Sequence, residues 1–420
     1  MKVLIAAIAC HPIAGSEAYV GWQAVSALRR EHQLFVMTSL WCREAIEKAV
    51  SMEEGWERVR FVYVDEKRGK KPCHPNRMIA RLHSWIDYRR WCTDAGEIAR
   101  QLIKQEHFDL AHHVTYASWR MGSPLAGLGI PWIWGPIGGG ERFPWRLAGI
   151  LSPVAICFEI FRSLSTKVSM SLPVIRRAVR DASLILPNNP ETENLLLRLG
   201  GKSLKMRQLA QSFIPEERLK RLKRLERITP RECGELRCVA GGNLEGRKGV
   251  AIALRSLALL AVEGIPFQYT YLGRGPELAH LQALTDRLGI AERVNFVDSL
   301  SGDEYVQALK SSHVYLLPSL REGVPVTQME AMAAGCVPVV AACGGAGPMA
   351  MEAGVLPILV GWDYEMAAAI AERLGGLWKL PLSWSTQSES STRAIREKYS
   401  SEHYRTKINS IYSIAAIRSE

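Results

Sequence analysis

Short apolar runs alternate with longer amphipathic segments along most of the chain. In the first half, apolar runs such as Val3–Ala9 and Leu110–Val114 are separated by stretches with helical periodicity. Buried parallel strands joined by crossover helices produce this pattern. We therefore expect a doubly wound parallel sheet with the strands Val3–Ala9, Leu34–Thr38, Arg60–Val64, Leu110–Val114, Trp132–Trp134 and Leu184–Pro187.

The same alternation starts again in the second half, after a basic, loop-rich stretch at Gln211–Cys233. Helix signals accompany it, including a capping box at Ser301–Glu304. We interpret the Ser-rich segment Ser383–Thr392 as a polar loop. The pattern predicts an α/β protein with two Rossmann-like domains facing across a cleft, at residues 1–212 and 234–395, with a linker at 213–233. The strands expected in the second domain are Leu236–Ala240, Phe267–Leu272, Val294–Val297, Val314–Leu317, Val337–Val340 and Leu356–Val360.

Two glutamates, Glu322 and Glu330, belong to one strand–loop–helix unit, LLPSLREGVPVTQMEAMAAGCVPVV. The loop follows the strand Val314–Leu317, so Glu322 lies at the carboxyl edge of a sheet, where open α/β folds bind ligands. Glu330 lies in the following helix, Val326–Ala334, and is close enough to reach the same cleft. Both carboxylates can accept hydrogen bonds from hydroxyls such as those of a sugar and a ribose. The alternative to a ligand site is that Glu322 only interacts with the helix dipole and that Glu330 is only a solvated residue of the helix.

Two further loops carry groups suited to an anion. In GGNLEGRKGV, Arg247 and Lys248 come just before a helix N-terminus, where cations and free backbone N–H groups converge. Gly15 and Ser16 lie between the first strand and the helix that follows it, and a glycine there allows a backbone to approach a phosphate. Taken singly, a basic pair before a helix is more often merely solvated, and any tight strand–helix turn favours a glycine.

Together, the GSE loop, the Arg-Lys-Gly segment and the glutamate pair followed by EAMAAG resemble retaining glycosyltransferases of the GT-B fold, family 4. The resemblance covers residues 1 to about 360. It implies a first domain on the acceptor side, a second domain that binds the nucleotide-sugar donor, and a terminal helix at 396–420 that returns to the first domain. The sequence departs from the family pattern at Ala346–Met349, where an acid-bearing loop is usual.

The resemblance also implies roles for these residues. Arg247 and Lys248 would neutralise the departing diphosphate, Glu322 would hold the hydroxyls of the donor sugar, and Glu330 would hold the ribose. The anomeric centre would be retained through same-face attack assisted by the leaving phosphate. The remaining positions expected on the donor side are Gly15, Ser16, Asn243, Gly273, Gly323 and Val324.

On the acceptor side, His112 and His113 end a strand in FDLAHHVTYASW. Strand alternation sends the two rings to opposite faces, so only one can enter a cleft, and we favour His113. The alternative for either one is a core histidine with its nitrogens satisfied. The loop WGPIGGGE places Gly138, Gly139 and Gly140 after another strand. These glycines permit close approach of an acceptor or serve as a flexible connection.

The composition favours anionic partners. The formal net charge is +11 and the sequence pI is about 9.2, with basic residues concentrated at 142–180 and 202–231. No nucleic-acid-binding module accompanies this charge, so nucleic acid is not an expected partner. The segment Trp145–Val179 mixes apolar and basic residues, which suits an amphipathic helix pair on an anionic membrane surface or a plain helix with a solvated basic face.

Other features of the sequence limit the chemistry. The nine cysteines show no CxxC pair or metal-ligand spacing, which is typical of reduced thiols in a cytosolic protein. There is no D-x-D triplet, so we expect no metal site, and we expect no cofactor apart from the nucleotide sugar as substrate. The N-terminal run MKVLIAAIAC is interpreted as a first Rossmann strand rather than a signal peptide.

We therefore expect a cytoplasmic, metal-independent, retaining hexosyltransferase, either free in the cytoplasm or peripheral on the inner face of the plasma membrane. It would transfer a sugar from a nucleotide-sugar donor to a hydroxyl of a glycan or lipid-linked glycan, as in surface polysaccharide or glycolipid biosynthesis. The alternatives are a GT-B epimerase, which needs no acceptor, and a phosphorylase, which needs a pyridoxal-type lysine. A third alternative is a non-catalytic protein that binds membranes or nucleic acid through its basic surface.

Overall fold

The computed structural model describes residues 1–65, 77–116, 118–224, 226, 228–298 and 300–417, without the side chains of residues 16 and 77–85. The chain divides into two compact units. The first unit comprises residues 1–140, 163–213 and 402–420, and the second comprises residues 141–162 and 214–401. The expected domain at 1–212 therefore differs from the structure at residues 141–162, which pack with the second unit.

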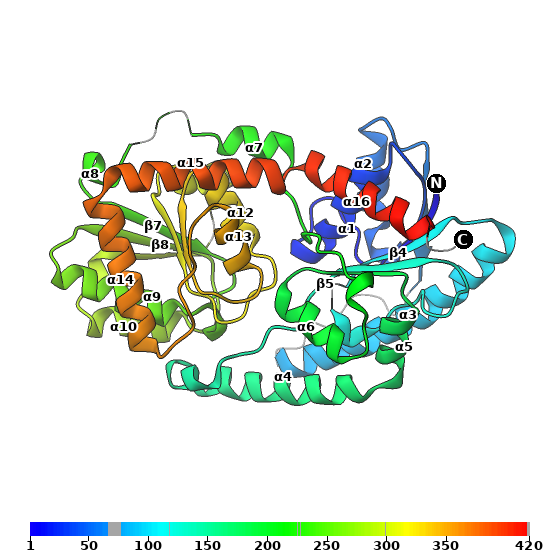
Figure 1. The fold of residues 1–420 in the computed structure, drawn as a ribbon, viewed down its shortest axis with the longest axis horizontal. Coiled ribbons are helices and arrows are strands. Elements are labelled where there is room, and N and C mark those ends of the chain that lie inside the picture. Colours follow the sequence, from blue (N-terminus) through cyan, green and yellow to red (C-terminus); the bar gives the residue numbers. More distant parts are fainter. Residues whose placement is uncertain (66–76, 117, 225, 227, 299, 418–420) are drawn as a thin grey trace. The chain divides into compact units, whose positions relative to one another are not determined.

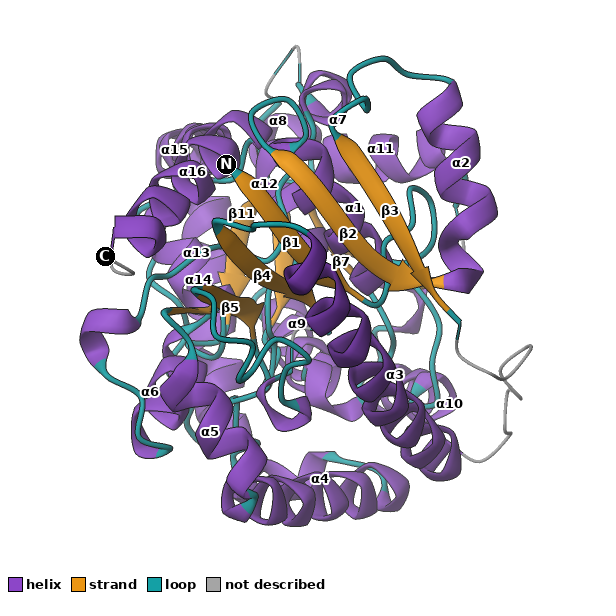
Figure 2. Cartoon of the chain, turned by 90° about the vertical axis from the view of Figure 1, so that its right-hand side faces the viewer, coloured by secondary structure: helices purple, strands orange, loops and turns teal. Residues whose placement is uncertain are grey.

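The first unit contains a six-stranded parallel sheet with the order β3-β2-β1-β4-β5-β6. Figure 2 shows β1, β2 and β3 side by side. The order reverses between β1 and β4, and such a reversal is the position at which open α/β folds bind ligands, beyond the carboxyl ends of the strands. All six predicted strands are present, with ends shifted by a few residues. Their bounds are β1 Lys2–Ala7, β2 Gln33–Ser39, β3 Val59–Val64, β4 Leu110–Thr115, β5 Trp132–Ile137 and β6 Leu184–Pro187.

Alternate residues of β1 enter two separate cores, because side chains of a strand point to opposite faces. Leu4 packs in the core that includes residues of α3, α5 and α6, and Ile5 packs in the core that includes residues of α1, α2 and α16. The terminal helix α16 buries Ile408 and Tyr412 in the second of these cores. The helices of this unit are α1 Ser16–Leu28, α2 Arg43–Ser51, α3 Arg77–Gln105, α5 Pro173–Asp181, α6 Pro190–Arg198 and α16 Ser401–Ile417. The first residue of α16, Ser401, is counted with the second unit.

The second unit contains a five-stranded parallel sheet with the order β11-β10-β7-β8-β9, which reverses between β7 and β10. The helices α9 and α14 lie side by side next to this sheet (Figure 1). The strands are β7 Leu236–Gly241, β8 Phe267–Leu272, β9 Val294–Val297, β10 Val314–Leu317 and β11 Val337–Val340. The helices are α7 Glu216–Leu222, α8 Pro230–Cys233, α9 Val250–Val262, α10 Leu278–Arg287, α11 Gly302–Lys310, α12 Val326–Ala333, α13 Ala346–Glu352, α14 Asp363–Lys379 and α15 Pro381–Lys398.

The segment 141–162 joins the second unit through polar contacts as well as its apolar side chains. It holds the 3₁₀ turn Trp145–Ile150 and the first half of α4, Pro153–Ser171. The Glu159 carboxylate pairs with Arg321 at 2.7 Å, and the Ser152 hydroxyl donates to Glu277 at 2.5 Å. These partners lie far away in the sequence, which is why the local pattern does not reveal this boundary.

Three local predictions for the second half are wrong. Leu356–Val360 makes only an isolated bridge, between Ile358 and Ala341, instead of a strand. Ser383–Thr392 lies within α15, because Trp384 is buried and the hydroxyls bond carbonyl groups, as Ser388 does with Gly335 at 2.6 Å. The expected linker contains α7 and α8. The capping box at Ser301–Glu304 is confirmed, and it opens α11.

None of the helices in the described part of the chain combines the length and the apolar composition that a membrane crossing needs.

Candidate functional site

The basic pair and the first glutamate of the motif meet at the point where the second sheet reverses its strand order. Arg247 and Lys248 lie in the 3₁₀ turn Gly246–Lys248, between β7 and α9. Glu322 lies in the loop between β10 and α12. Because β7 and β10 are neighbours and parallel, both loops emerge at the same edge. The predicted convergence of these residues is confirmed.

Direct contacts join the three side chains. The Lys248 ammonium lies 2.5 Å from Glu322 Oε2, and Arg247 Nη1 lies 3.7 Å from the same oxygen. Arg247 Nε also contacts Glu245 Oε2 at 2.7 Å, and the Ser319 hydroxyl donates to Glu322 Oε2 at 3.3 Å. Lys248 and Glu322 are both buried. The result is a buried carboxylate with two cations on one of its oxygens.

The charge of Glu322 is maintained by these neighbours. Burial alone raises the pKa of a carboxyl group, but Lys248 and Arg247 outweigh it, and the net pKa of Glu322 is lowered from 4.5. Burial likewise opposes the charge of Arg247, whereas Glu322 and Glu245 raise its pKa above the usual value. At neutral pH the site therefore carries fixed charges of both signs.

Close backbone packing fixes the loop that carries Glu322. A Cβ on Gly249 would lie 2.1 Å from Pro318 O, and one on Gly344 would lie 1.6 Å from Glu322 O. Both glycines have positive φ, at 67° and 52°. The amide of Leu320 donates to Arg247 O at 2.8 Å, so the two loops are joined directly. Glycine is required at 249 and 344 because any side chain would displace this loop.

Two amides in this loop have no hydrogen-bond acceptor in the described part of the chain. Among the described residues, no acceptor takes the backbone N–H of Gly323 or Val324. Both follow Glu322 and precede α12. Free N–H groups beside Lys248 and Arg247 form an arrangement suited to binding an anion.

Glu330, the second glutamate, has different partners. Arg218 Nε of α7 donates to its Oε1 at 2.7 Å, and the Tyr305 hydroxyl of α11 donates to its Oε2 at 2.7 Å. The Arg218 guanidinium also lies over the Tyr305 ring, 5.3 Å from its centre. These partners differ from those of Glu322, and the prediction that Glu330 reaches the same cleft stays a prediction. Each oxygen of Glu330 keeps a lone pair available for a further donor.

Glycines also bring the β7–α9 and β8–α10 loops together. A Cβ on Gly273 would lie 2.2 Å from Gly242 O, and Gly273 has φ 139°. Its contact with Gly242 therefore aligns the β8 loop with the one that carries Lys248. Asn243 is exposed and its side chain donates to Glu245 Oε1 at 3.4 Å.

In the first unit, Gly15 caps α1 and has open space where a Cβ would lie. The backbone of Ser16 opens α1, but its side chain lies outside the described residues. These residues lie on the β1 side of the strand-order reversal in this sheet. Among the described residues, no atom lies within 4 Å of the position that a Cβ on Gly15 would take, which suits approach of a ligand.

The two histidines are core residues. Alternation places them on opposite faces, as expected. His112 Nε2 lies 2.6 Å from Gly135 O and Nδ1 lies 2.7 Å from the Tyr412 hydroxyl, and burial lowers its pKa to about 4. His113 Nε2 lies 2.8 Å from Thr115 O, and burial lowers its pKa to about 3. The structure differs from the expectation that His113 enters a cleft, because both rings are buried.

The triple glycine packs against its own unit. A Cβ on Gly138 would lie 2.5 Å from the Asn188 side chain, and one on Gly140 would lie 2.4 Å from Thr192 Cα. Gly139 O accepts a hydrogen bond from Arg120 at 2.7 Å. These contacts explain the three glycines through packing of the β5 loop against α6, rather than through approach of an acceptor.

The second unit, which contains this geometry, is similar to known proteins. Residues 235–379 match the family model described as "Glycosyl transferases group 1". This part of the chain is therefore similar to glycosyl transferases group 1. It contains Arg247, Lys248, Glu322 and Glu330.

Two curated relatives agree with this assignment. The chain is 31% identical over 180 residues to the putative colanic acid biosynthesis glycosyltransferase WcaL of Salmonella typhimurium, a match that covers 41% of this chain and 43% of WcaL. It is 32% identical over 150 residues to the amylovoran biosynthesis glycosyltransferase AmsK of Erwinia amylovora, covering 33% of this chain and 36% of AmsK. The matches span less than half the length of either relative.

Solved structures show the fold of the whole chain. HepE (Alr3699) of Anabaena, crystallised in complex with UDP, has a TM-score of 0.63 at 16% identity, covering 98% of this chain and 100% of HepE. At this identity the likeness shows the fold alone. The chain has the GT-B fold, with two parallel-sheet α/β domains, so the predicted fold class is confirmed.

The prediction missed one residue beside the charged cluster. Tyr271 of β8 is completely buried, and its hydroxyl has no hydrogen-bond partner among the residues that the structure describes. Burial raises its pKa most, and the charges of Glu322, Arg247 and Glu245 also influence it. The pattern TYLGRGPE indicates a strand and a turn, but it does not indicate that this hydroxyl points toward the charges.

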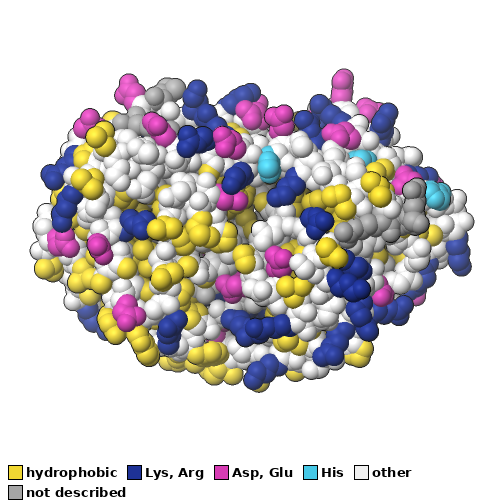
Figure 3. Space-filling view, in the orientation of Figure 1, with side chains coloured by type: hydrophobic (Ala, Val, Ile, Leu, Met, Phe, Trp, Pro, Cys, Tyr) yellow, Lys and Arg dark blue, Asp and Glu magenta, His cyan; other side chains and the backbone are white. Residues whose placement is uncertain are grey.

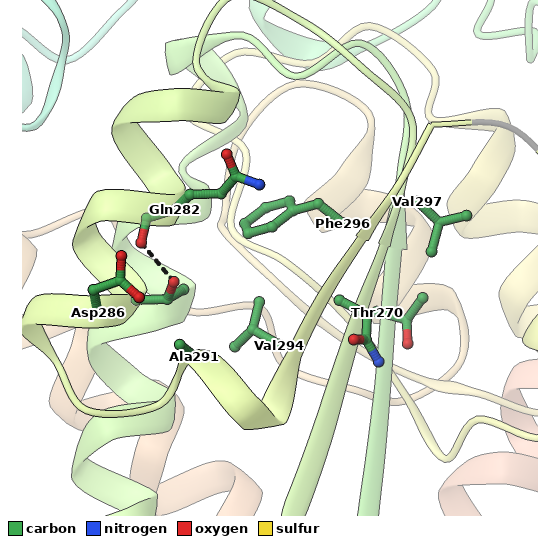
Figure 4. A pocket seen from close by; sticks show the side chains of 9 residues that line it. Thr270, Gln282, Asp286, Ala291, Val294, Phe296 and Val297 are labelled. Atoms are coloured by element: carbon green, nitrogen blue, oxygen red, sulfur yellow. Dashed lines mark hydrogen bonds between the residues drawn. The ribbon is translucent and has the colours of Figure 1, made fainter.

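A separate pocket of about 730 Å³ lies at the edge strand β9. Figure 4 shows Gln282 of α10 extending toward Phe296 of β9, and Asp286 and Val297 also line the pocket. None of the predicted site residues lines this pocket. Among the described residues, no cluster of three or more His, Cys, Asp or Glu side chains is arranged to hold a metal ion.

Proposed function

We propose that this protein is a retaining, metal-independent hexosyltransferase of family 4. It transfers a sugar from a nucleotide-sugar donor to a hydroxyl of a glycan or lipid-linked glycan during polysaccharide or lipopolysaccharide biosynthesis. The observation that carries the proposal is the contact of Lys248 and Arg247 with Glu322 at the strand-order reversal of the second unit. The names of the relatives WcaL and AmsK support polysaccharide biosynthesis as the setting.

The two cations serve as the diphosphate site. When a donor binds, its phosphate oxygens replace Glu322 as partners of Lys248 and Arg247, and the amides of Gly323 and Val324 provide further donors. Negative charge grows on the diphosphate as its bond to the anomeric carbon breaks, and fixed cations lower the energy of that state. HepE, which shares the fold, was crystallised with UDP and with UDP-glucose, which supports a nucleotide sugar as donor.

The two glutamates hold the donor's hydroxyls. Once Lys248 turns to phosphate, the carboxylate of Glu322 is free to accept hydrogen bonds from the sugar. Glu330 accepts hydrogen bonds from the ribose through its remaining lone pairs, while Arg218 and Tyr305 fix its orientation. Two-point recognition of sugar and ribose positions the anomeric carbon for attack.

Retention follows from attack on the same face that the diphosphate leaves. The bond from the anomeric carbon to the phosphate oxygen breaks, and the acceptor oxygen forms its bond to that carbon. The acceptor's proton passes to the departing phosphate oxygen, so no separate protein base is needed. This proposal therefore gives no proton-transfer role to the buried His113. The acceptor is assigned to the first domain, and Gly15 and Ser16 remain proposed contacts of the donor.

The test is incubation with a panel of nucleotide sugars, scored by thermal stabilisation and by release of the nucleotide. The expected result is one preferred donor, from which the nucleotide is released slowly. A glycan acceptor should accelerate this release of the nucleotide, and a chelator such as EDTA should leave its rate unchanged. Conversion of the donor without any acceptor would instead indicate an epimerase. Absence of stabilisation by every donor would contradict the proposal.

A further inference from the structure

The helix α4 has an inverted distribution of polar and apolar side chains. Its buried side carries Glu159, which is 3% exposed and paired with Arg321, and Ser169. Its outer side carries Val154, Leu164 and Val168, which are 76%, 57% and 64% exposed. A surface helix of a globular protein normally does the opposite, with apolar side chains inward and polar side chains outward.

The exposed apolar side chains form one continuous stripe. Val154, Cys157, Phe161, Leu164 and Val168 follow one another at alternating intervals of three and four residues, and all are exposed. On an α-helix this spacing places side chains on one face. A contiguous exposed apolar surface of this kind marks an interaction site, whereas single exposed apolar residues do not.

Cations accompany the stripe. Lys167 lies on the same exposed face of α4, and the following helix α5 exposes Arg176, Arg177 and Arg180. The Arg176 guanidinium donates to Met170 O of α4 at 3.2 Å, which places it against the end of that helix. Apolar and basic side chains both occur along the lower edge of Figure 3, where Figure 1 draws α4.

The acidic groups of these helices do not neutralise this charge. Glu159 is buried and already paired with Arg321. Asp181 accepts a hydrogen bond from Arg177 at 3.1 Å, which offsets one of the three arginines of α5. Lys205 also donates to the carbonyl oxygens of Arg180 and Ala182, at 2.9 and 2.8 Å, and so adds a cation at the end of α5.

We propose that the outer face of α4, together with the arginines of α5, binds the surface of an anionic lipid bilayer. The apolar stripe inserts among the acyl chains near the headgroups, while Lys167, Arg176 and Arg180 contact lipid phosphates. A bilayer fits better than a second copy of this chain, because pairing the stripe with itself would bring the same cations together. This surface lies outside the candidate donor site, and the inference does not depend on the proposed function.

The experiment measures binding of the full-length protein to vesicles by co-sedimentation. One set of vesicles is phosphatidylcholine alone, and the other is an equimolar mixture of phosphatidylcholine and phosphatidylglycerol. The expected result is binding to the mixed vesicles that weakens as salt is raised. Cys157 is exposed, and the other cysteines that are not buried or lie outside the described residues, Cys73, Cys92 and Cys233, are replaced by Ser. An environment-sensitive fluorophore on Cys157 should then shift to the blue on binding, because Cys157 would enter an apolar medium.

Two variants separate the contribution of the apolar stripe to vesicle binding from that of the arginines. Leu164→Gln/Val168→Gln should lower the partition coefficient for mixed vesicles about tenfold, through loss of inserted apolar surface. Arg176→Gln/Arg180→Gln should lower it about fivefold for each charge removed. The matched control Val262→Gln/Leu359→Gln changes equally exposed residues elsewhere and should leave binding unchanged.

Three results would overturn the proposal. The first is equal loss of binding in the control variant, and the second is no shift of the Cys157 fluorophore. The third is a dimer of the wild type, in analytical ultracentrifugation without lipid, that Leu164→Gln/Val168→Gln converts to a monomer. Circular dichroism of each variant checks that the fold is intact. Nucleotide release measured without vesicles tests the proposed function separately, so the two can fail independently.

Discussion

The buried pair between Lys248 and Glu322 should make the stability of the second unit depend on both partners together. Replacing Glu322 with Gln removes the negative charge but keeps the shape and one acceptor oxygen. Lys248 then remains buried with no opposite charge at 2.5 Å. Breaking a buried pair by removal of one partner is much more costly than replacing both partners.

The magnitude follows from the distances. With an effective dielectric constant of about 20, attraction at 2.5 Å amounts to about 7 kcal/mol, and at the 3.7 Å of Arg247 to about 4 kcal/mol. Desolvation of the buried ions offsets most of this attraction, and removal of one partner typically costs about 3–5 kcal/mol. We expect about 3 kcal/mol for Glu322→Gln, because Gln still accepts a hydrogen bond, and about 2 kcal/mol for Lys248→Met, because Arg247 still compensates Glu322.

The assay is urea-induced unfolding at neutral pH, followed by circular dichroism, for the wild type, both single variants and Lys248→Met/Glu322→Gln. The double variant should lose at least about 1.5 kcal/mol less than the sum of the single variants. The exposed pair Lys379–Glu263, at 3.3 Å, is the matched control, and Glu263→Gln should cost less than about 1 kcal/mol. Strictly additive losses would refute the reasoning, since they would mean that the two charges do not interact.

Three further predictions concern other parts of the molecule. The pKa of His112 is about 4 in the folded chain, compared with 6.5 for an ordinary histidine. His112 therefore contributes stability that is complete above pH 6.5 and is lost as the pH falls toward 4, a loss of about 3 kcal/mol. In pH-dependent urea unfolding, His112→Gln should remove this part of the pH dependence. Gly344→Ala should destabilise the second unit by at least about 2 kcal/mol in the same assay. The control Gly264→Ala, at a similar positive φ but in open space, should cost about 1 kcal/mol, and equal losses would contradict the close contact with the Glu322 loop. Tyr305→Phe should reduce the preference for a ribonucleotide over its 2′-deoxy form several-fold in calorimetric titration, because Glu330 loses the hydrogen bond from the Tyr305 hydroxyl, one of its two fixed contacts. An unchanged preference would exclude this positioning role of Tyr305.

The sequence predicted the fold and the main contact of the site because both follow from local pattern and topology. The strands β8, β9, β10 and β11 have the predicted bounds, since buried parallel strands are continuous apolar runs between turn residues. Arg247 and Glu322 are 75 positions apart, yet they meet because parallel neighbouring strands place their loops at one edge.

The features that the sequence did not reveal depend on tertiary partners. Ser388 lies in a helix because its hydroxyl reaches Gly335 O, and no local rule for serine indicates such an acceptor. Glu330 faces Arg218 and Tyr305, which come from two separate helices. A strand-end pattern cannot distinguish a histidine that faces a ligand from one that is buried, and His113 is buried.

The most direct test of the diphosphate site is a calorimetric titration of wild type and Arg247→Met with a nucleoside diphosphate and with its nucleoside. The nucleoside diphosphate used in the titration is the one that raises the thermal stability of the wild type most. If Arg247 and Lys248 hold the phosphates, Arg247→Met should weaken binding of the diphosphate at least about tenfold and leave binding of the nucleoside unchanged. Equal affinity of both proteins for the diphosphate would contradict the assignment of this site.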